Sequence, residues 1–259
     1  MKQSIVEVKK RQQALLTMFE AQNDIKVKDA SEILGVSELT IRRDFEMFQS
    51  KGVITRYHGG AKLVSETRIP APKYKEKNNL NLNQKIAIAK IASSYIKDND
   101  TLFINAGTTT YEILKIVIHL PITILTNNAA ISELSSDKDP AKVIYTGGEY
   151  NPANKSLSGN LVELMIRKMT SSICILGVNG ISSVDGLTTA YYPETIVNEA
   201  FLNRSKGLKI VVADGSKLGK SYGFASSDLS SIDVLITDET ADKNEISKIE
   251  QSGVEVVIA

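Results

Sequence analysis

The spacing of apolar residues divides the chain into an amino-terminal helical part and a longer part in which helices and strands alternate. Apolar positions three and four residues apart share one face of a helix, so their recurrence predicts amphipathic helices. Three such groups occupy the first fifty residues: Val8, Leu15, Met18 and Phe19; Val27, Ala30, Ile33 and Leu34; and Ile41, Phe45 and Phe48. They predict three helices that pack on one another.

Turn and capping residues separate these helices. Gly35 stands where the second helix should end, because glycine adopts a left-handed conformation without steric cost. Ser37 follows as a good N-cap for the third helix. The β-branched residues that come next predict a short strand, and Gly59-Gly60 predicts a tight turn. We therefore expect a winged helix-turn-helix over residues 1–62.

A polar segment separates this part from the rest. Pro70 and Pro72 cannot continue a helix, which favours a linker at residues 63–82. From 83 to 259, helices alternate with continuous apolar strands, which predicts a Rossmann-like α/β domain with a largely parallel sheet covered on both faces. The strands are expected at 101–105, 122–126, 142–146, 172–176, 209–213, 234–237 and 254–258, and the helices at 86–96, 109–118, 129–134, 160–169, 194–204 and 244–251.

Composition and charge restrict the class of protein. The 259 residues are 42% apolar and 24% charged, which excludes disorder of the whole chain. No run of 18 apolar residues and no apolar leader occurs, so we expect a cytoplasmic protein without a membrane span. The one cysteine, Cys174, lies in an apolar run and is expected to be buried rather than to bind a metal. The net charge is +1, yet residues 1–62 carry +3 and the remainder −2, so a local module can bind a polyanion.

The third expected helix carries a basic group suited to DNA. Arg42 and Arg43 lie just inside its capped end, with Thr40 beside them. An arginine fork matches guanine O6 and N7 in the major groove, and arginine, threonine and helix amides bind phosphates. The alternative is a solvated face on which both arginines pair with acidic neighbours, namely Glu38, Asp44 or Glu46.

Five successive strands of the expected sheet end in small, hydroxyl, amide or glycine residues. Open α/β sheets bind ligands beyond the carboxyl ends of their strands. The candidate residues are Asn105, Gly107, Thr108, Thr109 and Thr110; Thr126 and Asn127; Gly147 and Gly148; Asn179 and Gly180; and Asp214 and Lys217. A glycine turn with threonine hydroxyls and free amides at a helix start is an anion site, for which Lys217 supplies countercharge. An ordinary capped helix start is the alternative, and no Walker or GxGxxG motif supports nucleotide binding.

Two stretches resemble the signature of DeoR-type bacterial transcription regulators, VS-x-x-TIRRDL followed by R-x-HGGA. Here they read VSELTIRRDF from Val36 to Phe45 and RYHGGA from Arg56 to Ala61. The resemblance implies that DNA is contacted from the third helix and, less specifically, from the wing. The implied contact residues are Ser37, Thr40, Arg42 and Arg43, with Arg56 and His58 on the wing. For His58, a hydrogen bond that stabilises the turn is the alternative.

The second part resembles the sensor domain of the same family. The motifs that carry this resemblance are Gly107-Thr108-Thr109, Thr126-Asn127, Gly147-Gly148, Gly177 to Ile181, and Asp214 to Lys217. It implies a fold similar to ribose-5-phosphate isomerase and glucosamine-6-phosphate deaminase, and a phosphorylated sugar as effector. Asn105 stands where the family usually has aspartate, and its amide donates as well as accepts without carrying charge.

Together these expectations predict a transcriptional repressor that controls a carbohydrate-utilisation operon. The repressor is expected to bind operator DNA and a sugar phosphate. It is expected to need no metal or cofactor, and to form a dimer or tetramer because paired heads read repeated half-sites. One alternative is an active sugar-phosphate isomerase or deaminase fused to a DNA-binding module. Asn179 cannot act as its general base, which leaves Asp185, Glu194 and Asp214. Another is a DNA-binding scaffold with a vestigial body.

Overall fold

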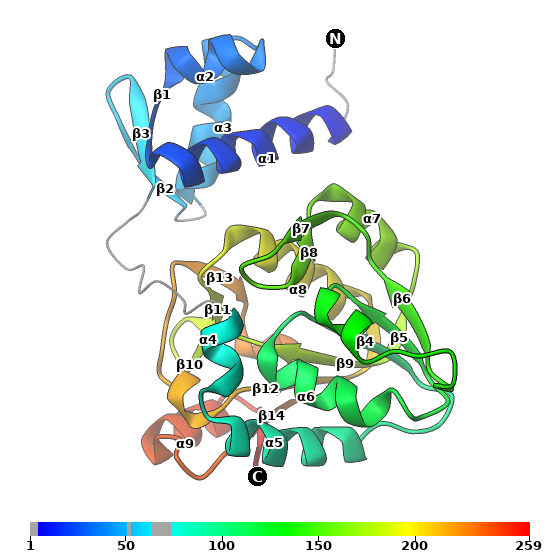
Figure 1. Cartoon of the computed structure of the whole chain (residues 1–259). Helices are drawn as coiled ribbons and strands as arrows, with labels where there is room; N and C mark the ends of the chain where they lie inside the picture. Colours follow the sequence, from blue (N-terminus) through cyan, green and yellow to red (C-terminus); the bar gives the residue numbers. More distant parts are fainter. Residues whose placement is uncertain (1–4, 51–52, 64–73) are drawn as a thin grey trace. The chain divides into compact units, whose positions relative to one another are not determined.

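The computed structural model describes residues 5–50, 53–63 and 74–259, in two compact units, Met1–Ile69 and Pro70–Ala259 (Figure 1). The elements of the first unit are α1 (Ile5–Gln22), β1 (Asp24–Lys26), α2 (Val27–Leu34), α3 (Glu38–Ser50), β2 (Ile54–Tyr57) and β3 (Gly60–Leu63). Gly35 adopts the left-handed conformation, with φ at 62°, and ends α2. The Thr40 amide donates to the Ser37 hydroxyl at 3.3 Å, which caps the start of α3. The predicted three helices and wing are confirmed.

Aromatic side chains form the core of the first unit. Phe19, Phe45 and Phe48 are at most 1% exposed, and the rings of Phe19 and Phe45 lie 5.3 Å apart. Two details differ from expectation. Ile33 is 66% exposed, so the apolar stripe of α2 only partly faces this core. Strand β1 pairs with β3 in the antiparallel order β1-β3-β2, and three residues are too few for an alternating pattern that would predict a strand.

A seven-stranded sheet with the order β15-β14-β12-β9-β4-β5-β6 is the centre of the second unit. Every neighbouring pair is parallel, as predicted. Its strands are β4 (Thr101–Ile104), β5 (Thr123–Thr126), β6 (Lys142–Tyr145), β9 (Ser171–Gly177), β12 (Ser205–Val212), β14 (Val234–Thr237) and β15 (Glu255–Ile258). All seven lie where continuous apolar runs predict them.

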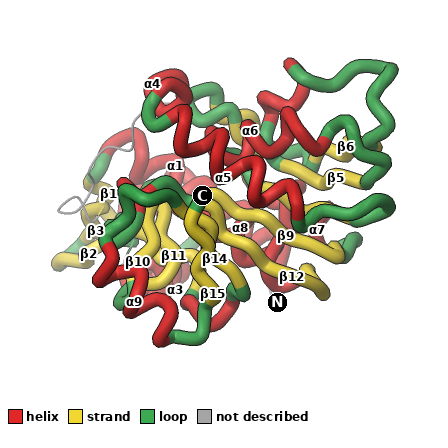
Figure 2. The backbone as a smooth tube through the Cα atoms, turned by 90° about the horizontal axis from the view of Figure 1, so that it is seen from below, coloured by secondary structure: helices red, strands yellow, loops and turns green. Residues whose placement is uncertain are grey.

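Helices cover both faces of this sheet (Figure 2). Successive strand residues point to opposite sides, so an apolar run makes both faces apolar, and both are buried under helices. Phe103 packs with Phe201 on one face, whereas Leu102 and Ile104 belong to the core on the other. The first face is covered by α7 (Asn160–Arg167), α8 (Tyr192–Arg204) and α9 (Lys243–Gln251), and the second by α5 (Leu82–Ser94) and α6 (Thr108–Val117). Cys174 is fully buried, as predicted, and this burial raises the pKa of its thiol.

Several short elements of the second unit were not predicted. They are the antiparallel sheet of β10 (Gly180–Ser182), β11 (Gly186–Thr189) and β13 (Phe224–Ser227), the hairpin of β7 (Glu149–Asn151) and β8 (Ser156–Ser158), and the 3-10 helices η2 (Gly215–Lys217) and η3 (Leu229–Ser231). The helix expected at 129–134 is a 3-10 helix, η1 (Ala129–Glu133). Helix α4 (Tyr74–Asn79) lies inside the expected linker. The Tyr74 amide donates to the Ala153 carbonyl at 2.9 Å, so this part of the segment belongs to the second unit.

The order of the strands creates a crevice beside β4. From β4 the sheet grows through β5 to β6, and the chain then returns to build β9, β12, β14 and β15 on the other side. The connections that follow β4 and β9 therefore leave in opposite directions. In open α/β sheets, ligands bind at such a switch point, outside the carboxyl ends of the strands.

Candidate functional site

Helix α3 presents an exposed basic face in the first unit. The side chains of Arg42 and Arg43 are both exposed, and Leu39 beside them is 60% exposed. Arg42 pairs with Glu38, Nη2 to Oε2, at 3.2 Å. This is one of the ion pairs expected if α3 presented only a solvated face. Arg43 forms no ion pair within the described part of the chain, so its guanidinium is available to a ligand.

The hairpin of β2 and β3 places a third arginine, Arg56, beside α3. Arg56 donates from Nη1 to Glu46 at 2.8 Å and from Nε to Gln49 at 2.7 Å, which fixes the hairpin against α3. His58 is exposed in the turn. Arg42, Arg56 and His58 line one hollow between α3 and the hairpin. Three of the predicted DNA-binding residues therefore share one hollow, and Ser37, Thr40 and Arg43 lie in the first part of α3 or just before it.

Asp44, the acidic residue of the TIRRDF motif, faces the interior. Its Oδ2 accepts from Arg11 Nε at 2.6 Å, and its Oδ1 accepts from Arg11 Nη2 at 3.3 Å and Gln12 Nε2 at 3.0 Å. The two charged side chains are only 9% and 5% exposed. Asp44 thus joins α3 to α1 and does not pair with the neighbouring arginines.

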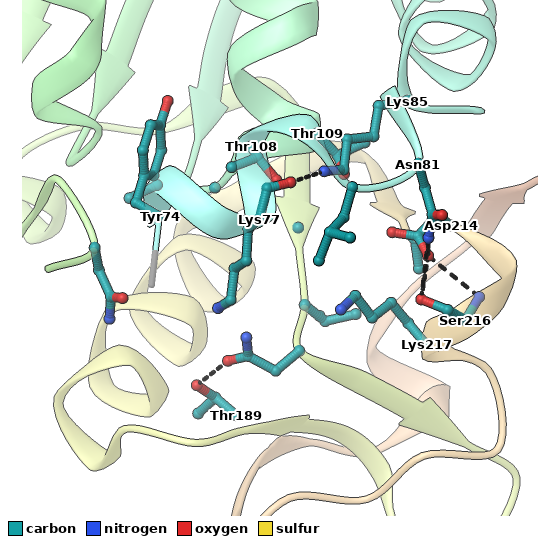
Figure 3. Close-up of a pocket in the computed structure, with 18 of the residues that line it drawn as sticks. Tyr74, Lys77, Asn81, Lys85, Thr108, Thr109, Thr189, Asp214, Ser216 and Lys217 are labelled. Atoms are coloured by element: carbon teal, nitrogen blue, oxygen red, sulfur yellow. Dashed lines mark hydrogen bonds between the residues drawn. The ribbon is translucent and has the colours of Figure 1, made fainter. Parts of the chain in front are cut away.

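A pocket of about 100 Å³ opens at the switch point of the sheet in the second unit. Its walls are the loops after β4, β9 and β12, together with α4, the start of α5, the turn between β7 and β8, and the start of α8 (Figure 3). Its lining includes six of the predicted residues: Gly107, Thr108, Thr109, Asn179, Asp214 and Lys217. The predicted site at the strand ends therefore overlaps with the pocket at the ends of β4, β9 and β12.

One wall of the pocket is the start of α6. Gly107 is its N-cap and supplies no side-chain hydrogen bond, so the first amides of the helix have no capping acceptor. Thr108 and Thr109 occupy the first turn and line the pocket. Amides, hydroxyls and the positive end of the helix dipole together favour an anion here.

Three lysines approach the same cavity. Lys217 comes from η2, Lys77 from α4 and Lys85 from α5 (Figure 3). Lys85 is 3% exposed, and its ammonium donates to the Lys77 carbonyl. Burial lowers the pKa of both Lys77 and Lys85, and the charge of Lys217 lowers each further. A bound anion would relieve this mutual repulsion.

Two carboxylates also line the pocket. Asp214 caps η2 by accepting from the Ser216 amide at 3.2 Å, and it accepts from the Asn81 amide at 3.0 Å. Glu194, in the first turn of α8, accepts from the Thr189 hydroxyl and from Asn154 Nδ2 at 3.2 Å. Burial raises the pKa of the Glu194 carboxyl, while its two hydrogen bonds and the charge of Lys77 act in the opposite direction.

Lys77, Lys85 and Glu194 were not among the predicted ligand-binding residues. Lys77 lies in the expected linker, where its polar neighbours give no sign of a helix. The other two are marked by helix periodicity: Lys85 shares the apolar face of α5 with Ile88, Ala89 and Ala92, and Glu194 shares that of α8 with Val197 and Phe201. A charged residue on the apolar face of a helix is a usable signal.

The remaining predicted residues do not line the pocket; several of them hold its walls. Asn105 binds the end of β9, donating to the Gly177 carbonyl and accepting from its amide, both at 2.8 Å. The Thr110 hydroxyl donates to the Asn105 carbonyl, and Asn127 accepts from the Ala106 amide, each at 2.8 Å.

Beyond β4 the predicted residues are structural. The Thr126 hydroxyl donates to the Ile104 carbonyl at 2.7 Å and so joins β5 to β4. Gly147 and Gly148 have φ values of 69° and 107°, and a side chain at Gly148 would collide with the Ser158 carbonyl. A side chain at Gly180 would collide with the Lys220 carbonyl. These glycines permit close backbone approach.

Neither a metal cluster nor a membrane helix appears in the described ranges 5–50, 53–63 and 74–259. No three His, Cys, Asp or Glu side chains gather there as metal ligands would. No helix there has the length and apolar character needed to cross a membrane. Of the three carboxylates considered as a base, Asp185 lies outside the pocket and accepts from Ser182 and Ser221.

Comparison with known proteins relates both units to described families. Residues 11–67 match the DeoR-like helix-turn-helix domain, and residues 80–239 match the DeoR C terminal sensor domain. An uncharacterized HTH-type transcriptional regulator of Haemophilus influenzae is 30% identical over 96% of both chains. The lactose phosphotransferase system repressor of Lactococcus lactis is 28% identical over 94% of this chain and 96% of its own.

A further relative and a solved structure are also similar to this chain. A putative aga operon transcriptional repressor of Escherichia coli O157:H7 is 27% identical over 96% of this chain and 93% of its own. Among solved structures, ribose 5-phosphate isomerase A of Methanocaldococcus jannaschii superposes on 53% of this chain and 54% of its own, with 13% identity and a TM-score of 0.39.

Proposed function

This chain belongs to the DeoR family of helix-turn-helix transcriptional regulators, and we propose that it represses a carbohydrate-utilisation operon. It binds operator DNA through the first unit and a phosphorylated sugar in the pocket of the second. The names of the lactose and aga operon repressors among its relatives support this assignment. It works in the cytoplasm. Because two DNA-binding units are needed to bind repeated half-sites, it works as a dimer or tetramer.

The observation that carries the effector proposal is the group of three lysines that line the same pocket as the start of α6. Lys77, Lys85 and Lys217 surround a cavity that is also lined by Thr108 and Thr109. Burying ammonium groups together is unfavourable unless a negative charge joins them. A phosphate group satisfies the lysines, the threonine hydroxyls and the helix amides at once.

The position of Lys77 suggests how occupancy of the pocket acts on the DNA-binding unit. Lys77 belongs to α4, the first described element after the segment that joins the two units in the sequence. A phosphate bound to Lys77 therefore fixes the part of the second unit that is nearest along the chain to the first. An effector must bind the two DNA-binding states unequally in order to regulate, and ordering of α4 supplies such a difference.

An active isomerase or deaminase is the second candidate, and the pocket gives it little support. Asn179 stands in the loop after β9, and its side chain is an amide without a basic atom, so it offers no base. Asp214 is occupied as a cap, and Glu194 is held by Thr189 and Asn154. We therefore propose a sensor without catalysis and without a cofactor. Measured turnover of ribose 5-phosphate or glucosamine 6-phosphate would overturn this.

A scaffold with a vestigial body is the third candidate. Such a body has no need to keep three lysines, one of them the buried Lys85, at a switch-point pocket, because gathering like charges there destabilises the fold. This candidate would gain if no phosphorylated metabolite changed either the melting temperature of the protein or its affinity for DNA.

Replacing Arg43 with alanine is expected to weaken operator binding by about 1–3 kcal/mol, because an exposed arginine of α3 is lost from the major groove. Arg42→Ala should weaken binding as well. The measurement is fluorescence anisotropy of labelled operator DNA at fixed salt, since salt alone changes such affinities. Arg167→Ala, which removes an exposed arginine of the second unit, is the charge-matched control. Unchanged operator affinity would remove the substituted arginine from the interface.

Replacing Lys217 or Thr108 with alanine is expected to raise the effector concentration needed for half of the response about 10-fold or more, because a charged or hydroxyl contact to phosphate is lost. Affinity for DNA in the absence of effector should stay at the wild-type value. Titrations of effector into the protein–DNA complex measure both quantities. Lys220→Ala removes an exposed lysine three residues away and serves as control. A normal response in both variants would contradict the phosphate site.

A further inference from the structure

Glu194 and Asp214 are the two carboxylates among the described residues that line the pocket, and Glu194 does not cap a helix. Asp214 caps a helix and accepts from two neighbouring side chains, Asn81 and Ser216. The Glu194 carboxylate accepts only from neutral groups in the described part of the chain: the Thr189 hydroxyl on Oε2 and the Asn154 amide on Oε1. No lysine or arginine nitrogen of the described residues lies within 4 Å of it.

The surroundings of Glu194 fix its carboxylate in place at an energetic cost. Asn154 comes from the turn between β7 and β8, and Thr189 from the end of β11, so two separate elements hold the two oxygens. Burial raises the pKa of the carboxyl, while Thr189, Asn154 and the charge of Lys77 act in the opposite direction. Two neutral donors and the more distant charge of Lys77 thus hold this carboxylate in the pocket wall with no cation in hydrogen-bond contact, which indicates a use for it when the pocket is filled.

The charge of Glu194 determines which part of a ligand lies beside it. A carboxylate repels phosphate, and the three lysines attract it, so phosphate lies among the lysines and Thr108. Figure 3 shows Lys77 extending from α4 towards the side of the cavity on which Thr189 lies. The group next to Glu194 must therefore be a donor without negative charge. Each carboxylate oxygen accepts one bond from the protein and retains a lone pair for a second donor.

We infer that Glu194 is the residue that recognises the sugar part of the effector, by accepting a hydrogen bond from one of its hydroxyl groups. The ligand is then a phosphate monoester that carries a hydroxyl remote from its phosphate. This inference rests on the proposed function and adds to it the residue that distinguishes a sugar phosphate from phosphate itself. Glu194 then determines which sugar is bound, and the three lysines provide affinity for the phosphate group that all such ligands share.

The test compares two ligands that share the phosphate and differ in the hydroxyls. Isothermal titration calorimetry of the full chain gives the affinity for the tightest member of a panel of pentose and hexose phosphates, and competition gives that for inorganic phosphate. In Glu194→Ala the affinity for the sugar phosphate should fall about 10–100-fold, as for loss of a hydrogen bond to a charged group. The affinity for inorganic phosphate should stay constant or rise, because a repelling charge is removed.

Two further variants keep the result interpretable. Glu194→Gln keeps the shape of the side chain and one acceptor oxygen, and it should lose less affinity for the sugar phosphate than Glu194→Ala. Glu199→Ala, on the exposed side of the same helix and outside the pocket, should bind both ligands as the wild type does. Circular dichroism of each variant verifies that the protein remains folded.

The outcomes separate this inference from the function on which it rests. If wild-type protein binds a sugar phosphate and Glu194→Ala keeps that affinity, or loses both ligands equally, the role of Glu194 is wrong and the effector site stands. If wild-type protein binds inorganic phosphate but no sugar phosphate of the panel more tightly, the proposed effector itself is wrong. A selective loss of the sugar phosphate supports both.

Discussion

Replacing Asp44 with alanine is expected to destabilise the first unit by about 3 kcal/mol, because it removes the carboxylate that accepts two hydrogen bonds from the nearly buried Arg11 guanidinium. Arg11 donates two hydrogen bonds to Asp44, and both side chains are nearly inaccessible to water. Loss of a buried charge from one side of an ion pair costs far more than loss of an exposed pair. The acidic residue of the TIRRDF motif would thus matter for folding of the DNA-binding unit and not for contact with DNA.

Hydrogen exchange of the α1 and α3 amides under increasing urea measures the stability of this unit within the full chain. Glu46→Ala is the control, because Glu46 lies on the same helix and its pair with Arg56 is exposed. Replacing both residues, Arg11→Met with Asp44→Leu, should cost less than Asp44→Ala, since two apolar side chains fill the space without a buried charge. A loss below about 1 kcal/mol in Asp44→Ala would show that the pair contributes little.

Replacing Asn105 with aspartate is expected to destabilise the second unit by about 3 kcal/mol above neutral pH. The Asn105 amide nitrogen donates to the Gly177 carbonyl at 2.8 Å and to Asn198 Oδ1 at 2.9 Å. Asn198 can turn its amide to donate to a carboxylate, but the Gly177 carbonyl can only accept. A carboxylate at this position would therefore face an acceptor oxygen across the junction of β4 and β9.

The cost of Asn105→Asp should depend on pH in a defined direction. The buried carboxyl would have a pKa above its value in the unfolded chain, near 3.9, because its protonated form alone can donate to Gly177. The folded state then binds more protons, so stability relative to wild type falls as pH rises from about 4 through the raised pKa. Urea denaturation at several pH values measures this, with the exposed Asn203→Asp as control. A pH-independent difference would contradict the proposed role of the Asn105 amide.

Local signals account for most of what the sequence predicted correctly. Gly35 and Ser37 mark the turn of the helix-turn-helix because their roles are set by backbone conformation and capping alone. The seven parallel strands are recognisable because each contains a continuous apolar run, which is buried on both faces in the inner strands and partly buried in the edge strands β6 and β15. The three residues of β10 and the four of β11 carry no such pattern, since their pairing depends on partners distant in the sequence.

The candidate ligand site was predicted only in part, because the strand order decides which strand ends meet. The pocket is lined by residues that follow β4 and β9, which flank the switch point, and β12, which is next to β9: Gly107, Thr108, Asn179, Asp214 and Lys217. The ends of β5 and β6 lie farther from the switch point, and their threonine, asparagine and glycines support the loops instead. Lys77 enters the pocket from a six-residue helix that no periodic pattern reveals.

The most direct test of the whole account is the affinity of the protein for DNA from upstream of its own gene and the neighbouring genes, with and without sugar phosphates. Fluorescence anisotropy at fixed salt gives this affinity, with the unphosphorylated sugars and a non-specific duplex as controls. The account predicts tight binding to one duplex and a change in affinity with one phosphorylated sugar but not with the free sugar. Binding to DNA that no sugar phosphate alters would contradict the proposed sensor, and failure to bind any duplex would contradict the DNA-binding face itself.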